Sequence, residues 1–346
     1  MKNYIYKIIT QGPKDPMGFA IKIILYLFSF LYLAAVKLRY IMYKAKLFKS
    51  ERLKAPVVSI GNITWGGTGK TPLVEAICGY FQSKGKRCVL LTRGYGMDED
   101  KALAQNLPDA LVLIGEDRVK NARSEETKGP VDIFLLDDGF QHMKIERDID
   151  IVTINATDPF GNGCLIPAGI LREPPAHLNR AEIVVITKSG LIGRAQLDCL
   201  KNKIIKLNPN AEIFESAHKL LYFQTAAGEE KDTIYIKGKN VCIVSALGDN
   251  SSFAKSVESL CDSIKLHFFY MDHHQYSSKD IDIIIKECRG RGINTIVTTQ
   301  KDWVKLKDIL KSVKSADGVE FLILKIKVSV SYEKNFYTRL SSIVSG

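Results

Sequence analysis

A glycine-rich stretch between an apolar run and a helical pattern constrains this chain more than any other feature. Residues 57–60 read Val-Val-Ser-Ile and predict a buried strand, whereas residues 66–71 read Gly-Gly-Thr-Gly-Lys-Thr. A helical pattern begins at Pro72. A strand, a glycine loop ending in Lys-Thr and a helix occur in this order in phosphate-binding P-loops. The chain is therefore expected to fold around a nucleotide site, although a glycine turn that only packs a helix onto a strand is the alternative.

The chemistry of a P-loop explains the residue types in this stretch. Glycines let backbone N–H groups converge on an anion, and the following helix N-terminus adds partial positive charge. Lys70 is expected to reach the β- and γ-phosphates, and the Thr71 hydroxyl to ligate Mg²⁺. Thr64 stands where the usual motif has its first glycine. The predicted nucleotide-binding residues are Thr64, Trp65, Gly66, Gly67, Thr68, Gly69, Lys70 and Thr71.

Short apolar runs alternate with helical patterns between residues 57 and 190. The runs at residues 89–92, 131–136 and 149–154 are apolar almost throughout. This pattern favours parallel strands that helices cover on both faces. Ligands of such sheets bind at the carboxyl ends of the strands. We therefore predict an α/β fold whose P-loop NTPase core places a parallel sheet between helices.

The length of 346 residues favours two domains over one. Near residue 220 the pattern changes, because runs at residues 219–223 and 233–236 flank a polar loop and predict a hairpin. Strand and helix patterns then resume up to the run at residues 321–328. The predicted organisation is an N-terminal membrane-associated helix (1–50), a P-loop core (51–220), a linker hairpin (221–240) and a smaller α/β C-terminal domain (241–346).

An apolar segment with basic flanks lies near the N-terminus. As a helix, residues 17–36 would be roughly 30 Å long, which is enough to cross a bilayer. Lysines and arginines follow this segment and lysines precede it, and positive charge tends to stay in the cytoplasm. Basic residues on both sides favour a helix that lies on the cytoplasmic surface of a membrane. A single span and a buried soluble helix are the alternatives.

The overall charge and the cysteines limit the function further. A net charge of +11 suggests a polyanionic partner such as a nucleotide, a nucleic acid or an anionic membrane. The seven cysteines are scattered and contain no C-x-x-C pair. We therefore expect a reducing compartment, with neither a disulfide framework nor a zinc site.

Acidic and basic residues follow several predicted strands. Asp137 and Asp138 end the apolar run 131–136 and resemble a Walker B motif that holds Mg²⁺, with a plain Asp-Gly turn as the alternative. A long loop over residues 158–174 carries Arg172 and Glu173, and loops of this length are usually functional. Arg172 could meet a phosphate and Glu173 a metal or Lys70, or the two could form a structural ion pair.

A second polar motif, Asp272-His273-His274, follows a strand of the predicted C-terminal domain. Paired histidines could bind a metal, and an Asp-His unit could instead act as a general base. Either histidine could also be an ordinary surface or capping residue.

Together these motifs resemble one known family, the tetraacyldisaccharide 4′-kinases, which are the lipid A 4′-kinases of Gram-negative bacteria. The resemblance covers about the whole chain in order. The segments that carry it are 61–62, 66–72, 93–96, 137–142, 160–163, 167–169, 171–174, 272–274 and 301–302.

The resemblance implies a membrane-bound lipid kinase. It implies ATP- and Mg²⁺-dependent phosphorylation of the 4′-hydroxyl of a tetraacyldisaccharide 1-phosphate, in lipid A (lipopolysaccharide) biosynthesis. The implied partners are this lipid substrate and the cytoplasmic face of the bacterial inner membrane, and nucleic acid is not among them. The oligomeric state is not predicted.

The catalytic base of the family is an aspartate assisted by a histidine. His273 matches the histidine, and Asp98 is the match for the aspartate, with Glu116 and Asp117 as rivals. Gln300 replaces the acid that usually precedes Lys301-Asp302, so that pair receives no catalytic role. The predicted site residues are Asp98, His273 and Lys70 for catalysis, Thr71, Asp137, Asp138 and Glu173 for the metal, and Asn62, Arg93, Tyr95 and Arg172 for the substrate.

Two other functions fit parts of the pattern. A membrane-associated P-loop ATPase switch that positions a partner protein commonly has a lysine directly before the glycine pair, where this chain has Trp65. A nucleic-acid-binding ATPase would use the positive charge, but no surface of alternating aromatic and basic residues is evident. Lipid transfer activity distinguishes the kinase from both alternatives.

Overall fold

A computed structural model shows that the protein consists of two compact units. The first contains residues 12–93, 110–216 and 330–344, and the second contains residues 217–329. Each unit has its own hydrophobic core. The structure describes residues 4, 8, 9, 12–94, 107, 110–271, 274–310 and 318–344.

A parallel sheet forms the centre of the first unit, and β1 lies between β4 and β5 in its middle. Every strand pairing within it is parallel, which confirms the fold class predicted from the apolar runs. The strand order is β7 (Glu212–Thr225), β6 (Ile183–Thr187), β5 (Ile149–Asn155), β1 (Val57–Gly61), β4 (Ile133–Asp137), β2 (Cys88–Thr92) and β3 (Leu111–Ile114).

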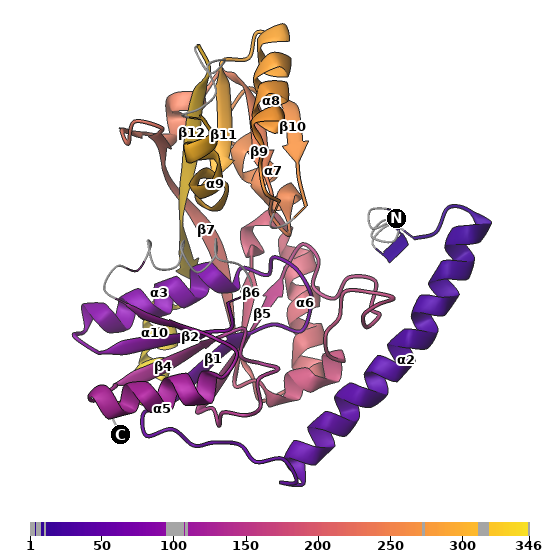
Figure 1. Cartoon of the computed structure of the whole chain (residues 1–346), viewed down its shortest axis with the longest axis vertical. Helices are drawn as coiled ribbons and strands as arrows, with labels where there is room; N and C mark the ends of the chain where they lie inside the picture. The colour runs from indigo at the N-terminus through magenta and orange to yellow at the C-terminus, as the bar shows by residue number, and fades with distance from the viewer. Residues whose placement is uncertain are drawn as a thin grey trace. The chain divides into compact units, whose positions relative to one another are not determined.

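Helices cover both faces of this sheet (Figure 1). Successive side chains of a strand point to opposite faces. On β2, Leu91 packs with Ala122 of α5, whereas Cys88 contacts Cys78 of α3. The helices of the unit are α2 (Pro16–Lys44), α3 (Lys70–Ser83), α5 (Arg118–Lys128), α6 (Arg194–Leu207) and α10 (Glu333–Ser341), with 3₁₀ helices η1 (Pro175–Arg180) and η2 (Ser189–Leu191).

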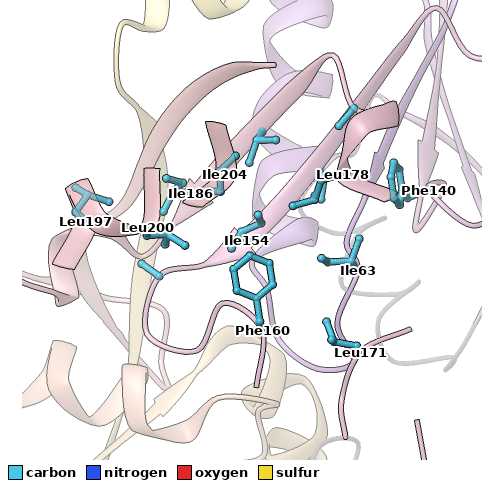
Figure 2. Packing of buried hydrophobic residues seen from close by; sticks show 14 residues of the cluster. Ile63, Phe140, Ile154, Phe160, Leu171, Leu178, Ile186, Leu197, Leu200 and Ile204 are labelled. Atoms are coloured by element: carbon cyan, nitrogen blue, oxygen red, sulfur yellow. The ribbon is translucent and has the colours of Figure 1, made fainter. Parts of the chain in front are cut away.

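The long loop after β5 is packed into the core. In Figure 2, Ile154 and Ile186 of the strands lie near Ile204 of α6, and Phe160 and Leu171 of the loop belong to the same buried cluster. Burying an apolar side chain of this size stabilises the fold by about 1.5–3 kcal/mol. The loop therefore has a fixed course, although it contains no long helix or strand.

The C-terminal helix α10 belongs to the first unit. The sequence-based boundary assigned all of residues 241–346 to the smaller domain and predicted no element after residue 328, whereas residues 330–344 group with the P-loop unit. The reason is aromatic packing, because Tyr337 stacks on Tyr80 of α3 with ring centroids 4.1 Å apart. Phe336 is fully buried and packs against Phe214.

Helix α2 is long, apolar and largely uncovered. It begins at Pro16, where the Asp15 side chain accepts a hydrogen bond from the Gly18 N–H, and it continues to Lys44. By length and composition it could cross a membrane, and only 6% of its most apolar window is buried. This exposure argues against a buried soluble helix. Its exposed large apolar side chains are Met17, Phe19, Ile23, Ile24, Tyr26, Leu27, Phe28, Phe30, Leu31, Leu38 and Ile41.

The second unit contains a sheet in which β10, β9, β11 and β12 are parallel neighbours. The order is β10 (Ser263–Phe269), β9 (Asn240–Ser245), β11 (Thr295–Thr299), β12 (Glu320–Val330) and then β7, with β8 (Glu230–Lys231) paired to β7. Its helices are α7 (Asn250–Glu258), α8 (Ser278–Gly290) and α9 (Gln300–Leu310).

The predicted linker hairpin is only partly correct. The first strand lies within β7 and pairs antiparallel with β8 through Phe223 and Lys231. The second predicted strand, residues 233–236, is instead the 3₁₀ helix η3 (Thr233–Ile236). Asp232 caps this helix by accepting a hydrogen bond from the Ile234 N–H, and this local bond favours a helical turn over a strand.

The close contact between β1 and the turn after β4 predicts that alanine substitutions at two glycines change the stability in opposite directions. A Cβ atom on Gly61 would lie 2.5 Å from Cβ of Phe140, whereas one on Gly79 of α3 would meet no atom within 4 Å. We expect Gly61→Ala to lower the free energy of unfolding by about 1–3 kcal/mol through overpacking. The control Gly79→Ala should raise it by up to about 1 kcal/mol through helix propensity. Urea denaturation followed by circular dichroism measures both, and equal midpoints for Gly61→Ala and the wild type would contradict the packing.

Candidate active site

The P-loop connects β1 to α3, as the sequence predicts. Gly69 caps α3 in a left-handed conformation with φ of 76°, and Gly66 has φ of 111°. Such backbone conformations favour glycine. The capping glycine has no side chain to bond the first N–H groups of α3, so these groups suit an anion.

Buried hydroxyl and amide groups brace the P-loop from beneath. The Asn62 side chain donates a hydrogen bond to Thr68 Oγ1 over 2.9 Å. The same oxygen lies 2.9 Å from Thr153 Oγ1 of β5. All three side chains are buried, so their hydrogen bonds fix the loop to the neighbouring strand β5.

The end of β6 holds the main chain of the same loop. Thr187 Oγ1 donates to the Thr68 carbonyl over 2.8 Å, and Lys188 Nζ donates to the Gly67 carbonyl over 3.1 Å. In the sequence, this Thr-Lys pair is compatible with a base-lining segment or a plain turn. Here it supports the P-loop from the end of β6, which is separated from β1 by β5.

Thr64 explains how the loop tolerates the loss of the first glycine of the usual motif. It forms an antiparallel bridge with Leu171 of the long loop, a conformation that needs no glycine. Beside this bridge, the Arg172 N–H donates to the Ile63 carbonyl over 2.7 Å. The long loop therefore runs along the P-loop and brings Arg172 to it.

The Asp138 carboxylate lies beside the P-loop and binds or faces the positively charged side chains of the site. Arg172 grips Asp138 with two hydrogen bonds of 2.7 and 3.0 Å, and Lys70 Nζ lies 3.7 Å from Asp138 Oδ1. Burial alone would raise the pKa of Asp138. The bonds from Arg172 and the charges of Lys70 and Arg118 outweigh burial, so this pKa lies below its ordinary value.

The oxygen donors near Lys70 fit a nucleotide-bound magnesium ion. Asp137 ends β4 in register with Ile60 of β1, and Thr71 lies in the first turn of α3. Among the described residues no group of three or more His, Cys, Asp or Glu side chains could hold a metal. Mg²⁺ usually takes one or two carboxylates together with phosphate oxygens and water, which this donor set allows.

Glu173 lies in a buried ionic network next to these acids. Glu173 Oε2 lies 2.6 Å from His177 Nδ1 and accepts a hydrogen bond of 2.7 Å from Arg180. Gln141 donates to Glu173 Oε1 over 3.0 Å, and to the Asn62 carbonyl over 2.9 Å. The network corresponds to a structural ion pair, with His177 and Arg180 as partners instead of Arg172. The role of Glu173 as a metal ligand stays a prediction.

The environment also lowers the pKa of Glu173. Burial would raise the pKa, but the hydrogen bond with His177 and the positive charge of Arg180 outweigh burial. The side chains of Gln141, His177 and Arg180 were not predicted to belong to the site. Gln141 lies in the segment 137–142 that carries the family resemblance, whereas His177 and Arg180 follow the long loop and had no signal of their own in the sequence.

Two rival candidates for the catalytic base have partners of their own. Asp117 caps α5 by accepting a hydrogen bond from the Lys120 N–H over 3.1 Å. Glu116 is exposed and pairs with Arg93 over 3.3 Å. The predicted residues Tyr95, Asp98 and His273 lie outside the described residues.

Comparisons with known proteins point to one family. The family model described as tetraacyldisaccharide-1-P 4′-kinase, LpxK, matches residues 21–103 and 97–345. The tetraacyldisaccharide 4′-kinase of Halothermothrix orenii is 32% identical over 95% of this chain and 94% of its own length. That of Syntrophus aciditrophicus is 34% identical over 94% of this chain and 93% of its own.

A solved structure agrees with these relatives. The crystal structure of LpxK from Aquifex aeolicus in complex with ATP is similar with a TM-score of 0.70 and 27% identity. The similarity covers 94% of this chain and 99% of that chain.

The Glu173 network predicts a pH-dependent contribution to stability. Glu173→Gln removes the negative charge beside Arg180, and it should lower the free energy of unfolding by about 3 kcal/mol at pH 7. Because folding lowers the pKa of Glu173, the wild-type advantage is complete above the unfolded pKa of about 4.3. It should disappear as the pH falls through the folded value.

Urea denaturation from pH 7 down to about pH 2 measures this difference, because the advantage is lost only below the unfolded pKa. The matched control is Glu116→Gln, which removes a carboxylate that is 83% exposed and should not change stability measurably. A Glu173→Gln protein as stable as the control at pH 7 would show that the network adds nothing.

Proposed function

This chain belongs to the tetraacyldisaccharide-1-P 4′-kinase family, and we propose that it transfers the γ-phosphate of ATP to the 4′-hydroxyl of a tetraacyldisaccharide 1-phosphate. This reaction belongs to lipid A biosynthesis, and its cofactors are ATP and Mg²⁺. The observation that carries the proposal is the P-loop, with Lys70 beside the Asp138–Arg172 pair. The similar Aquifex aeolicus structure contains ATP. An ATPase switch that positions a partner protein is less well supported, because the relatives are named as kinases.

The P-loop would bind the triphosphate through its main chain. Residues 64–71 supply N–H groups and the positive end of α3, and Lys70 would exchange Asp138 for phosphate oxygens. Thr71 with Asp137 and Asp138 would hold Mg²⁺ together with those oxygens, and Glu173 would serve as a ligand only if it exchanged its partners in the ionic network. The ion would neutralise negative charge on the phosphates.

Like Lys70, Arg172 would exchange Asp138 for oxygens of a phosphate group. Its guanidinium is held by Asp138 and lies 3.3 Å from Asn62 Oδ1, next to the P-loop. Arginine suits phosphate because its planar fork donates two parallel hydrogen bonds. We assign substrate binding to Asn62, Arg93, Tyr95 and Arg172.

Deprotonation of the sugar hydroxyl requires a base. We assign this role to Asp98, oriented by His273, from the family pattern in the sequence. As the 4′-oxygen forms its bond to the γ-phosphorus, its proton passes to the Asp98 carboxylate and the bond to the β-phosphate oxygen breaks. The capping bond of Asp117 and the exposure of Glu116 make these two rivals less suitable.

The exposed apolar surface of α2 supports a membrane location. An apolar helix with basic residues on both flanks would bind the cytoplasmic face of the bacterial inner membrane, where a lipid substrate with anionic groups is found. In this organisation residues 1–50 anchor the chain, residues 51–220 form the kinase core, residues 221–240 form a linker and residues 241–346 form the smaller domain, except that α10 groups with the core.

A transfer assay tests the proposed reaction. The full chain is incubated with γ-labelled ATP, Mg²⁺ and a tetraacylated glucosamine disaccharide 1-phosphate, and the label is followed into lipid. We expect transfer by the wild type and a fall of about 10²–10⁴-fold for Asp98→Ala, with ATP binding retained. Asp100→Asn, a change in a neighbouring acid, serves as the control. Release of phosphate without lipid labelling would favour the ATPase switch, and full activity of Asp98→Ala would exclude Asp98 as the base.

Vesicle sedimentation tests the membrane surface. Leu27 and Leu31 are 62% and 67% exposed on α2. The double variant Leu27→Glu/Leu31→Glu should lose binding to vesicles that contain phosphatidylglycerol, because two charges would enter the acyl region. Ile234→Glu changes an equally exposed residue of the second unit and should leave binding intact. Unchanged sedimentation of the double variant would place the membrane contact elsewhere.

A further inference from the structure

Helix α2 carries an unexpected polar contact on its covered side. Ser29 is buried, and its Oγ accepts a hydrogen bond from the Ala168 N–H over 3.0 Å. The same oxygen lies 2.8 Å from the Leu165 carbonyl. The helix is thus hydrogen-bonded to the backbone of the long loop that leads to Arg172.

Tyr32, one turn further along α2, contacts Arg172 directly. The Tyr32 hydroxyl donates a hydrogen bond to the Arg172 carbonyl over 2.9 Å. On the other side of the same residue, the Arg172 N–H donates to the Ile63 carbonyl of the P-loop segment. The backbone of Arg172 is therefore held from both sides, once by the P-loop and once by α2.

A third contact on the same side of α2 involves Tyr40. Its ring lies 5.0 Å from the His177 ring, and the Arg180 guanidinium lies 5.6 Å from its centroid. His177 and Arg180 are the two partners of Glu173 Oε2. Tyr32 and Tyr40 are about two turns apart and therefore lie on one side of the helix. That side contacts the backbone of Arg172 and the two side chains that bind Glu173.

We propose that Tyr32 is a positioning residue for phosphate transfer, because its hydroxyl fixes the backbone from which Arg172 reaches the phosphate. The proposal rests on the proposed function, in which Arg172 binds phosphate. Arg172 has a long side chain, so a small rotation of its backbone displaces the guanidinium strongly. A misplacement of about 1 Å can cost up to about 10²-fold in rate. Helix α2 is then part of the catalytic apparatus as well as a membrane anchor.

The first test removes one hydroxyl group. Tyr32→Phe keeps the ring and its packing and should lower kcat about 3- to 10-fold, the value of one hydrogen bond. Vesicle binding should not change. The control is Tyr43→Phe on the same helix, whose hydroxyl makes no hydrogen bond to the residues described, and its kcat should match the wild type. A Tyr32→Phe enzyme with wild-type kcat, or one that no longer binds vesicles, would overturn the proposal.

A double-mutant cycle distinguishes positioning from general destabilisation. If Tyr32 acts through Arg172, Tyr32→Phe should cause no further loss of kcat in an Arg172→Ala background. Arg172→Lys provides a second background with more residual activity, and the loss there should also be smaller than in the wild type. Equal losses in all three backgrounds would show that Tyr32 acts elsewhere. A wild type that labels no lipid would instead refute the proposed function itself, so the two failures are separable.

Discussion

The Asp138 carboxylate is the charge around which the P-loop unit is arranged. Burial would neutralise an isolated acid here, yet Arg172 and Lys70 keep its pKa low. These two cations come from distant parts of the sequence, one from the long loop and one from the start of α3. A triphosphate that enters the site offers them more negative charge than one carboxylate does. The ion pairs therefore hold the two cations in place for an anion, and under the proposed function a triphosphate that binds these cations would free Asp138 for a metal ion.

The long loop after β5 connects these charged residues to the hydrophobic core of the unit. Its apolar residues Phe160 and Leu171 are anchored in the buried cluster, so the residues that follow Leu171 cannot move freely. The bridge between Leu171 and Thr64 then aligns the loop with the P-loop. Directly after this bridge come Arg172 and Glu173, which enter two separate ionic networks. A segment without a long helix or strand is thus attached both to the core and to the P-loop.

The sequence predicts those parts of this design that depend on neighbouring residues. The strands follow from short apolar runs, and the P-loop and the acids at 137–138 follow from spacing. Contacts between distant segments leave no such pattern. The network around Glu173 joins residues from three segments, and α10 is fixed by Tyr80, which precedes Tyr337 by more than 250 positions. In the linker, the apolar run at 233–236 looked like a strand because nothing in its composition reveals the capping bond of Asp232.

Hydrogen bonding also explains why an apolar helix carries Ser29 and Tyr32 at all. A helix next to lipid gains nothing from a hydroxyl that lacks a partner, and an irregular loop near lipid needs partners for its carbonyl groups. The two side chains bond the carbonyls of Leu165 and Arg172 and so satisfy both requirements. The opposite side of α2 carries apolar residues such as Leu27 and Leu31, which stay exposed among the residues that the structure describes. One side of α2 is therefore suited to lipid, and the other side supplies hydrogen-bond partners to the long loop. The two kinds of residue lie on opposite sides because they follow the 3.6-residue period of the helix.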